Sequence, residues 1–287
     1  MIDKPRFGPG GNCDAFAAKY KGKGILAPRW VAENGLDVYE YEAGRGIMAS
    51  EEGLVAFGAA AKHAGVALTF HAPYFISLSS VEPEKRENSI RYIAESLYAA
   101  ELMDAEIIVV HTGSASKITR EEAMRLASDT VYRALCTLPD NGIAIGLETM
   151  GKINQLGTLD EVIQLCKMDS RLSPVIDFGH LNARSIGQAF PTADDYARVF
   201  TKIADALGDE KAKRVHCHFS RIEYTEKGGE KRHVTLSDTE WGPNPEPLMR
   251  VIADMKLCPT IISESAGTQT ADALYMKQYF ERISSHE

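Results

Sequence analysis

Several short apolar runs in this sequence end in a residue that could bind a metal ion or move a proton. The clearest is VIDFGHLNA, in which a β-branched run ends in Asp177 and is followed three residues later by His180. Five other runs end in the same way, and their terminal residues are His71, His111, Glu148, His218 and Glu264. A single acid or imidazole in such a place more often caps a helix or fills a core. Six runs with this ending predict a shared polar site, because several buried carboxylates together need compensating cations.

The donor types indicate which cations these are. Imidazole and carboxylate ligands without a thiolate suit Zn²⁺, and also Mn²⁺ or Fe²⁺, whereas Mg²⁺ and Ca²⁺ prefer oxygen ligands. The candidates are too many for one tetrahedral ion. We therefore expect two or three ions about 3.5 to 4 Å apart, bridged by a carboxylate such as Glu148, an arrangement that recurs in phosphoester hydrolysis. Two further histidines, His63 and His286, are interpreted as surface residues.

Six strand ends can meet only in a framework that gathers them on one side. Eight short β-branched runs alternate with helical patterns, and the runs begin at Arg6, Leu36, Val66, Ala105, Ile143, Leu172, Ala212 and Cys258. Parallel strands joined by right-handed helical crossovers close, at eight units, into a (β/α)₈ TIM barrel whose active site lies at the carboxyl ends of the strands. We predict this α/β fold as a single domain over residues 1–287. An open doubly wound sheet is the rival, but GPGGNCDAF matches its Gly-rich phosphate turn poorly.

The stretch from Ser220 to Pro247 shows no regular periodicity and is predicted to be a long loop over the catalytic face. It contains His233 and a basic group, Lys231 and Arg232.

Composition narrows the class of protein. The formal net charge of −8 disfavours a protein that coats nucleic acid, unless bound cations reverse the charge at one site. Five scattered cysteines form no CxxC pair, which is typical of a reducing compartment. No signal peptide or membrane span is expected, no protein partner is indicated, and we interpret the protein as cytoplasmic.

With these motifs in order, the sequence resembles endonuclease IV, the zinc-dependent apurinic/apyrimidinic endonucleases. The matching segments run from about Phe70 to Ser265 and are HAPYFISL, VVHTGS, ETMGKINQLGT, VIDFGHLNA, HFS, KRH and SES. The resemblance implies that His71 and His111 hold a first zinc ion and that Glu148 bridges it to a second. The second ion would be held by Asp177, His218 and Glu264, and a third would face His180 and His233.

The resemblance also implies contacts with damaged double-stranded DNA. Tyr74 matches an aromatic residue that contacts the lesion, and Arg45 matches an arginine inserted into the duplex. The family motif Asp-Arg-His reads Lys231-Arg232-His233 here, so a carboxylate ligand is replaced by an ammonium. The third ion would then be weak, absent, or completed by Glu226 or Glu230. Alternatively, Lys231 and Arg232 contact a substrate phosphate. The segment RFGPGGNCDAF also lacks a histidine that the family usually carries.

The implied activity is hydrolysis of DNA on the 5′ side of an abasic site, in base excision repair, with Glu148 or Glu264 orienting or deprotonating the attacking water. One rival is a sugar isomerase or epimerase of the same barrel type, which would use Glu148, Asp177, His218 and Glu264 around one Mn²⁺ or Mg²⁺ ion and leave the other histidines without a role. The other rival is a barrel that binds metal or damaged nucleic acid without cutting it.

Overall fold

Eight parallel strands form the centre of the molecule in the computed structural model, which describes residues 4–285. The strands are β1 (Arg6–Pro9), β2 (Val38–Glu42), β3 (Ala67–His71), β4 (Ile107–His111), β5 (Ala144–Glu148), β6 (Leu172–Asp177), β7 (His216–Phe219) and β10 (Thr260–Ser263). Their order around the sheet is β1-β10-β7-β6-β5-β4-β3-β2. Each of the eight runs expected from the sequence contains one of these strands, so the predicted TIM barrel is confirmed.

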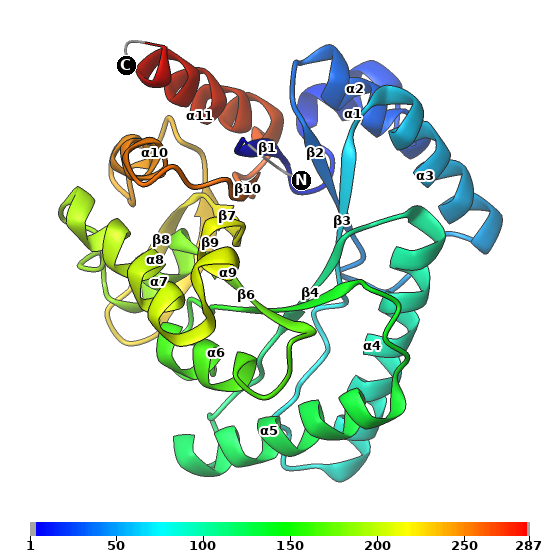
Figure 1. The fold of residues 1–287 in the computed structure, drawn as a ribbon, viewed down its shortest axis with the longest axis vertical. Coiled ribbons are helices and arrows are strands. Elements are labelled where there is room, and N and C mark those ends of the chain that lie inside the picture. Colours follow the sequence, from blue (N-terminus) through cyan, green and yellow to red (C-terminus); the bar gives the residue numbers. More distant parts are fainter. Residues whose placement is uncertain (1–3, 286–287) are drawn as a thin grey trace.

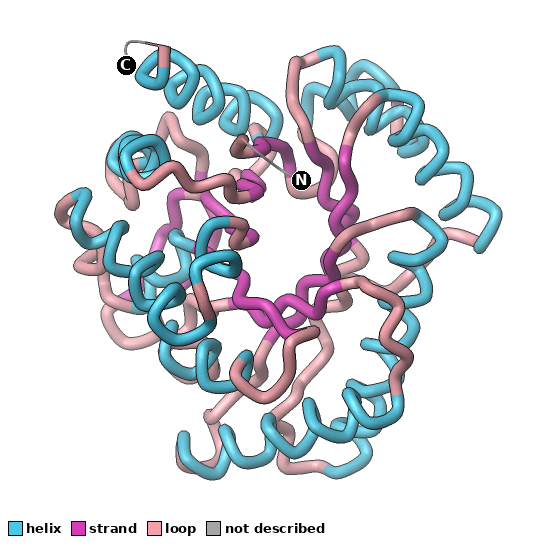
Figure 2. Tube along the Cα trace, viewed as in Figure 1, coloured by secondary structure: helices cyan, strands magenta, loops and turns pink. Residues whose placement is uncertain are grey.

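The barrel closes between β1 and β2, where Gly8 allows the strands to approach. A Cβ atom at Gly8 would lie 1.7 Å from the carbonyl oxygen of Val38, so only glycine fits there. Gly10 forms a parallel bridge with Glu40, and the amide of Gly11 donates to the Glu40 carbonyl at 3.0 Å. The strands therefore form a ring (Figure 2), and because neighbouring strands are parallel, their carboxyl ends lie on one side.

The helices lie outside this ring (Figure 1). The longer ones match the periodic segments of the sequence and are α3 (Glu51–Ala64), α4 (Pro83–Met103), α5 (Arg120–Thr137), α6 (Leu159–Cys166), α8 (Ala193–Leu207), α10 (Pro245–Asp254) and α11 (Gln269–Ser284). Shorter ones were not apparent from periodicity and are α1 (Asp14–Tyr20), η1 (Gly24–Leu26), α2 (Ala27–Glu33), α7 (Phe178–Arg184) and α9 (Asp209–Lys213). Their apolar faces and the outward side chains of the strands make the core.

The prediction of a long loop from Ser220 to Pro247 is wrong in one respect, because this segment contains an antiparallel hairpin. Strands β8 (Arg221–Thr225) and β9 (Gly229–Val234) pair with each other and lie apart from the barrel sheet. Periodicity missed them because the hairpin is half-exposed and strongly charged, so apolar residues do not alternate along it. None of the described helices is long and apolar enough to cross a membrane.

Candidate metal centre

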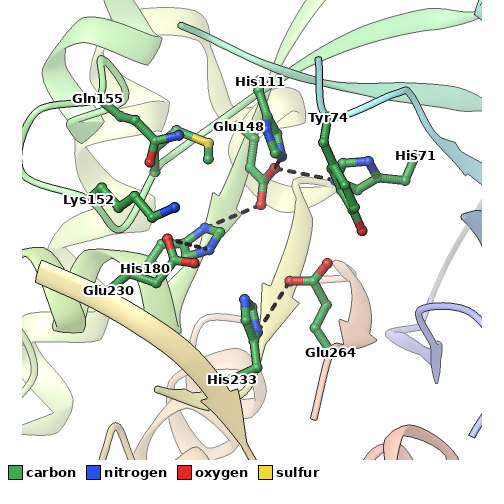
Figure 3. A pocket seen from close by; sticks show the side chains of 11 residues that line it. His71, Tyr74, His111, Glu148, Lys152, Gln155, His180, Glu230, His233 and Glu264 are labelled. Carbon is green, nitrogen blue, oxygen red and sulfur yellow. Dashed lines mark ion pairs between the residues drawn. The ribbon is translucent and has the colours of Figure 1, made fainter. Parts of the chain in front are cut away.

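A cavity of about 410 Å³ opens at the carboxyl ends of the strands. Figure 3 shows side chains from several strands and from the hairpin converging on it. Its lining residues are His71, Tyr74, His111, Glu148, Met150, Lys152, Gln155, His180, Glu230, His233 and Glu264. Residues far apart in the chain are thus brought to one place by the strand ends, as the motifs predicted.

Glu148, the last residue of β5, lies at the centre of this arrangement. One of its oxygens, Oε2, is 3.6 Å from Nε2 of His71 and 3.3 Å from Nε2 of His111. The other, Oε1, is 3.1 Å from Nδ1 of His218 and 3.4 Å from Nδ1 of His180. The two oxygens therefore face two separate groups of donors, as a bridging carboxylate would.

Several groups of candidate ligands have donor atoms within 4.8 Å of one another, and three of these groups cover the residues expected from the sequence. These sets are His71, His111 and Glu148; Glu148, Asp177, His218 and Glu264; and His180, Glu230 and His233. The first two sets contain the residues that the resemblance assigned to the first and second ions. The third differs only by the addition of Glu230.

Hydrogen bonds fix which nitrogen of two histidines faces the cavity. Nδ1 of His71 lies 2.8 Å from the carbonyl oxygen of Ala72, and Nδ1 of His180 lies 2.9 Å from that of Thr149. A carbonyl can only accept, so Nδ1 carries a proton in both rings and Nε2 is the nitrogen left to bind a cation. Metal-binding histidines are oriented in this way.

Asp177, the acidic residue of the VIDFGH motif, has two structural roles. Its Oδ1 accepts the backbone amide of His180 at 2.7 Å and so caps α7. Its Oδ2 is buried without a hydrogen-bond partner, as is Oε2 of Glu148. Buried carboxylate oxygens are rarely left unpaired. These atoms, with imidazole lone pairs beside them, fit divalent cations such as Zn²⁺, Mn²⁺ or Fe²⁺.

The pKa shifts of the ionisable groups also favour bound cations at this centre. Burial raises the pKa of Glu148, but His218, His111 and His180 lower it by more, so it is a carboxylate. Burial alone would lower the pKa of His71, yet Glu42 and Glu148 raise it to about 10. Burial raises the pKa of Glu264 well above its usual range. His71 and Glu264 therefore retain protons, whereas burial lowers the pKa of His111 and that of His233, so the negative charge that cations would neutralise is concentrated around Glu148 and Glu264.

A β-bulge in the hairpin explains how Glu230 reaches the third set. The register shifts where Glu223 pairs with Arg232 but Tyr224 pairs with Glu230, so Lys231 is an extra residue on β9. Lys231 and Arg232 both point outward and pair with Glu223, whereas Glu230 turns inward to lie 3.5 Å from Nε2 of His180. Bulges often redirect side chains beside active sites.

Gly151 provides the space for this carboxylate. A Cβ atom there would lie 2.9 Å from Oε2 of Glu230 and 2.9 Å from Cδ2 of His180. Glu226, the other residue considered for this role, is not among the residues that line the cavity.

The residues expected to contact substrate lie in different places. Tyr74 lines the cavity, stacks on His111 with ring centroids 5.4 Å apart, and donates its hydroxyl to Oε2 of Glu42 at 3.0 Å. Arg45 is exposed on the loop after β2. Lys231 and Arg232 are not brought into the cavity.

Sequence reasoning missed three polar residues of the centre, which are Glu40, Glu42 and Lys152. The two glutamates alternate with tyrosines in VYEYE, a signal that they share the inner face of β2. Lys152 lies in the loop after β5, and its ammonium points into the cavity (Figure 3). Nothing in the local pattern of ETMGKINQ predicts that direction.

The sequence of this chain is similar to those of several known proteins. A model of the xylose isomerase-like TIM barrel family matches residues 28–279. An uncharacterized protein of Methanocaldococcus jannaschii is 34% identical over 215 residues, covering 74% of this chain and 76% of that protein. A probable endonuclease 4 of Mycoplasma pneumoniae is 29% identical over 225 residues, covering 75% and 74%.

Two solved structures have the same fold. Endonuclease IV from Thermus thermophilus superposes with a TM-score of 0.72 at 21% identity, covering 97% of this chain and 100% of that one. A D-tagatose 3-epimerase-like protein superposes with a TM-score of 0.70 at 19% identity, covering 91% and 94%. The resemblance to endonuclease IV is thus confirmed by named relatives as well as by fold, and the chain belongs to the xylose isomerase-like TIM barrel family.

Proposed function

We propose that this protein is a metal-dependent phosphodiesterase that cleaves DNA on the 5′ side of abasic sites. The observation that carries the proposal is the presence of three neighbouring donor sets at the carboxyl ends of the strands, two of which share Glu148. A cluster of ions can hold both the attacking and the leaving oxygen of a phosphodiester. The relatives named probable endonuclease 4 support the same assignment.

The ligands would be the three sets described above, with Glu230 in place of the family's aspartate. When bound there, the cations would neutralise charge on the phosphate and acidify the attacking water. Zinc is the ion that the donor set and the family resemblance favour.

Glu264 is the better proton acceptor for that water. Both oxygens of Glu148 face candidate ligands and neighbouring histidines lower its pKa, which leaves Glu264 as the carboxylate to accept a proton. Its Oε1 faces His218 at 3.4 Å, and its Oε2 is directed toward His233 (Figure 3). We assign Glu264 as the base and Glu148 as the bridging ligand.

The rim of the cavity suits a duplex that lacks a base. Exposed apolar side chains come from the loops after β2 and β3, where Met48 is 87%, Tyr74 53% and Phe75 49% exposed. These could enter the gap left by a missing base, and Arg45 lies on the same loop as Met48. An abasic nucleotide also has little stacking to lose when it leaves the helix.

Lys152 would contact the phosphate. Among the described residues no ion pair occupies its ammonium, and the backbone beside it is held by arginines: Arg184 donates to the carbonyl of Met150 at 2.6 Å, and Arg120 to that of Ile153 at 3.1 Å. The cation in the cavity is therefore Lys152 rather than Lys231.

A sugar epimerase is the second candidate, favoured by the epimerase-like fold neighbour and by the compact set of Glu148, Asp177, His218 and Glu264. The deciding experiment incubates the purified protein with an abasic duplex, with an intact duplex and with ketoses. Nicking of the abasic strand alone, abolished by a chelator and restored by Zn²⁺ or Mn²⁺, is expected. Ketose turnover without nicking would overturn the proposal. A Glu264→Gln variant that still binds the duplex but no longer nicks it would exclude a pure binding protein.

A further inference from the structure

Beneath the metal centre, the interior of the barrel contains a second polar cluster. It consists of Glu40 on β2, Thr69 on β3, and His216 and His218 on β7, and all four side chains are buried. Glu40 and His218 are completely inaccessible to solvent. A carboxylate in such a place costs a large desolvation energy unless it is compensated, so its contacts require an explanation.

His218 connects this cluster to the metal centre, because its two ring nitrogens face opposite sides. Nδ1 lies 3.1 Å from Oε1 of Glu148 and 3.4 Å from Oε1 of Glu264, within the second set of candidate ligands. Nε2 lies 2.8 Å from Oε1 of Glu40, a buried oxygen that forms no hydrogen bond of full geometry, and 3.3 Å from Nε2 of His216. The ring thus presents one nitrogen to the ligands and the other to a buried carboxylate.

Glu40 is itself held by two neighbours. Its Oε2 accepts the hydroxyl of Thr69 at 2.8 Å and lies 2.9 Å from Nε2 of His216. The carboxylate is therefore fixed from β3 and β7, and its Oε1 is left for His218.

The same arrangement occurs at other histidines of the centre, but with weaker partners. His71 and His180 direct their outer nitrogens to backbone carbonyls, and His233 directs Nδ1 to the hydroxyl of Ser220 at 2.8 Å. His218 instead has the Glu40 carboxylate 2.8 Å from its outer nitrogen, closer than the 3.3 Å between Nδ1 of His180 and Oδ2 of Asp177. A charged acceptor forms a stronger hydrogen bond than a neutral one and makes the imidazole a better electron donor.

A separate deep ion held by Glu40, His216 and His218 is the alternative, since their donor atoms lie within 4.8 Å. It would require His218 to bind a cation through each nitrogen, and so to lose both ring protons. A neutral imidazole keeps one proton on either nitrogen throughout the physiological range. One nitrogen is therefore a ligand and the other a donor.

We propose that Glu40 is a positioning residue that accepts the Nε2 proton of His218 and so holds Nδ1 toward the metal centre. Thr69 and His216 orient Glu40 in turn. This inference rests on the metal-binding part of the proposed function and not on DNA cleavage.

The test compares Glu40→Gln with a control of similar burial, Thr260→Val, which removes a hydroxyl that accepts from Arg6 and keeps Glu40 and its partners. Zn²⁺ affinity is measured on the full-length proteins by competition with a chromophoric chelator, without DNA. Loss of an outer partner typically weakens binding by about 10- to 100-fold. We expect that loss for Glu40→Gln, with the same number of ions bound at saturation, and a change of no more than about 3-fold for Thr260→Val.

A second measurement needs no variant. In the zinc-loaded wild-type protein, a long-range nitrogen–proton NMR spectrum should show His218 protonated at Nε2 and not at Nδ1. His218 bound through Nε2, or unprotonated there, would overturn the proposal.

Three affinity results would also overturn it. Unchanged affinity in Glu40→Gln would remove the role, equal losses in both variants would indicate general packing, and one ion fewer with the others unaffected would indicate a deep metal site. Because affinity is measured without nucleic acid, a protein that shows the expected dependence yet never nicks DNA would contradict the proposed function and leave this inference intact.

Discussion

At the scale of single residues, Lys152 and Lys231 differ in the direction of their side chains. Both are lysines near the hairpin, yet Lys152 points into the cavity and Lys231 is paired with Glu223 on the outer side. The charge that matters for an anionic substrate is the one without a partner on the protein.

Replacement of Lys152 by alanine should therefore weaken substrate binding. We expect KM for an abasic duplex to rise about 5- to 10-fold with kcat changed much less, because an exposed charge-assisted contact contributes roughly 1 to 1.5 kcal/mol. The dependence of log KM on log salt should also become shallower, by about one phosphate contact. Steady-state kinetics at several salt concentrations measure both. Lys231→Ala is the matched control, and an equal effect there would contradict the assignment.

Glu230 and Glu226 lie in the same hairpin and also differ in where their side chains are placed. Only Glu230 lies against His180, so Glu230→Gln should remove a ligand of the third set whereas Glu226→Gln should not. Metal analysis after gel filtration should find one ion fewer per chain in Glu230→Gln. Loss of the same ion from Glu226→Gln instead would show that the hairpin is wrongly placed.

At the scale of elements, strands and helices were more predictable than the side chains that they direct. Each β-branched run gave a strand, and the terminal residues of six strands converge because parallel strands in a barrel share one mouth. Glu40 and Glu42 escaped attention because VYEYE ends as a half-polar run, although period-two alternation puts both acids inside. The place of Glu230 could not be predicted, since a bulge is fixed by the pairing of two strands and leaves little trace in either.

The bulge at Lys231 leads to a testable prediction about the sequence Lys231-Arg232-His233, which departs from the family motif Asp-Arg-His. If Lys231 is an extra residue on β9, its deletion should restore a regular ladder in which Glu230 directly precedes Arg232 and still faces His180. The deletion variant should keep its full metal content, and the substitution Lys231→Asp should add no ligand because that side chain points outward. Metal analysis and metal affinity of the two variants test this. A gain of affinity in Lys231→Asp would show that position 231 faces the cavity.

At the scale of the whole molecule, the ring of strands concentrates ionisable groups in a volume that water hardly reaches. Glu40, Glu42, Glu148 and Glu264 are gathered there with six histidines, and three of these histidines, His71, His180 and His218, bind protons more strongly in the folded chain than in the unfolded chain. Metal binding, proton binding and folding are consequently linked.

This linkage gives the metal-free protein a definite dependence of stability on pH. The pKa of His71 is raised to about 10, mainly by Glu42 and Glu148 acting against burial, while in the unfolded chain it is about 6.5. A base whose pKa rises on folding stabilises the fold fully below its unfolded pKa, and that contribution is lost as pH rises through its folded pKa. The pKa of His218 and that of His180 are also raised, so their contributions have the same sign. The melting temperature of the chelator-treated protein should therefore fall between about pH 6.5 and 10.

Protons compete with cations for these nitrogens, so the stabilisation by saturating Zn²⁺ should grow over the same interval. Thermal unfolding with and without metal measures both trends, and His71→Asn should flatten the decline in the metal-free protein. A melting temperature that rises with pH in the absence of metal would mean that the carboxylates do not hold protons on these histidines, and the charge argument for the metal centre would fail with it.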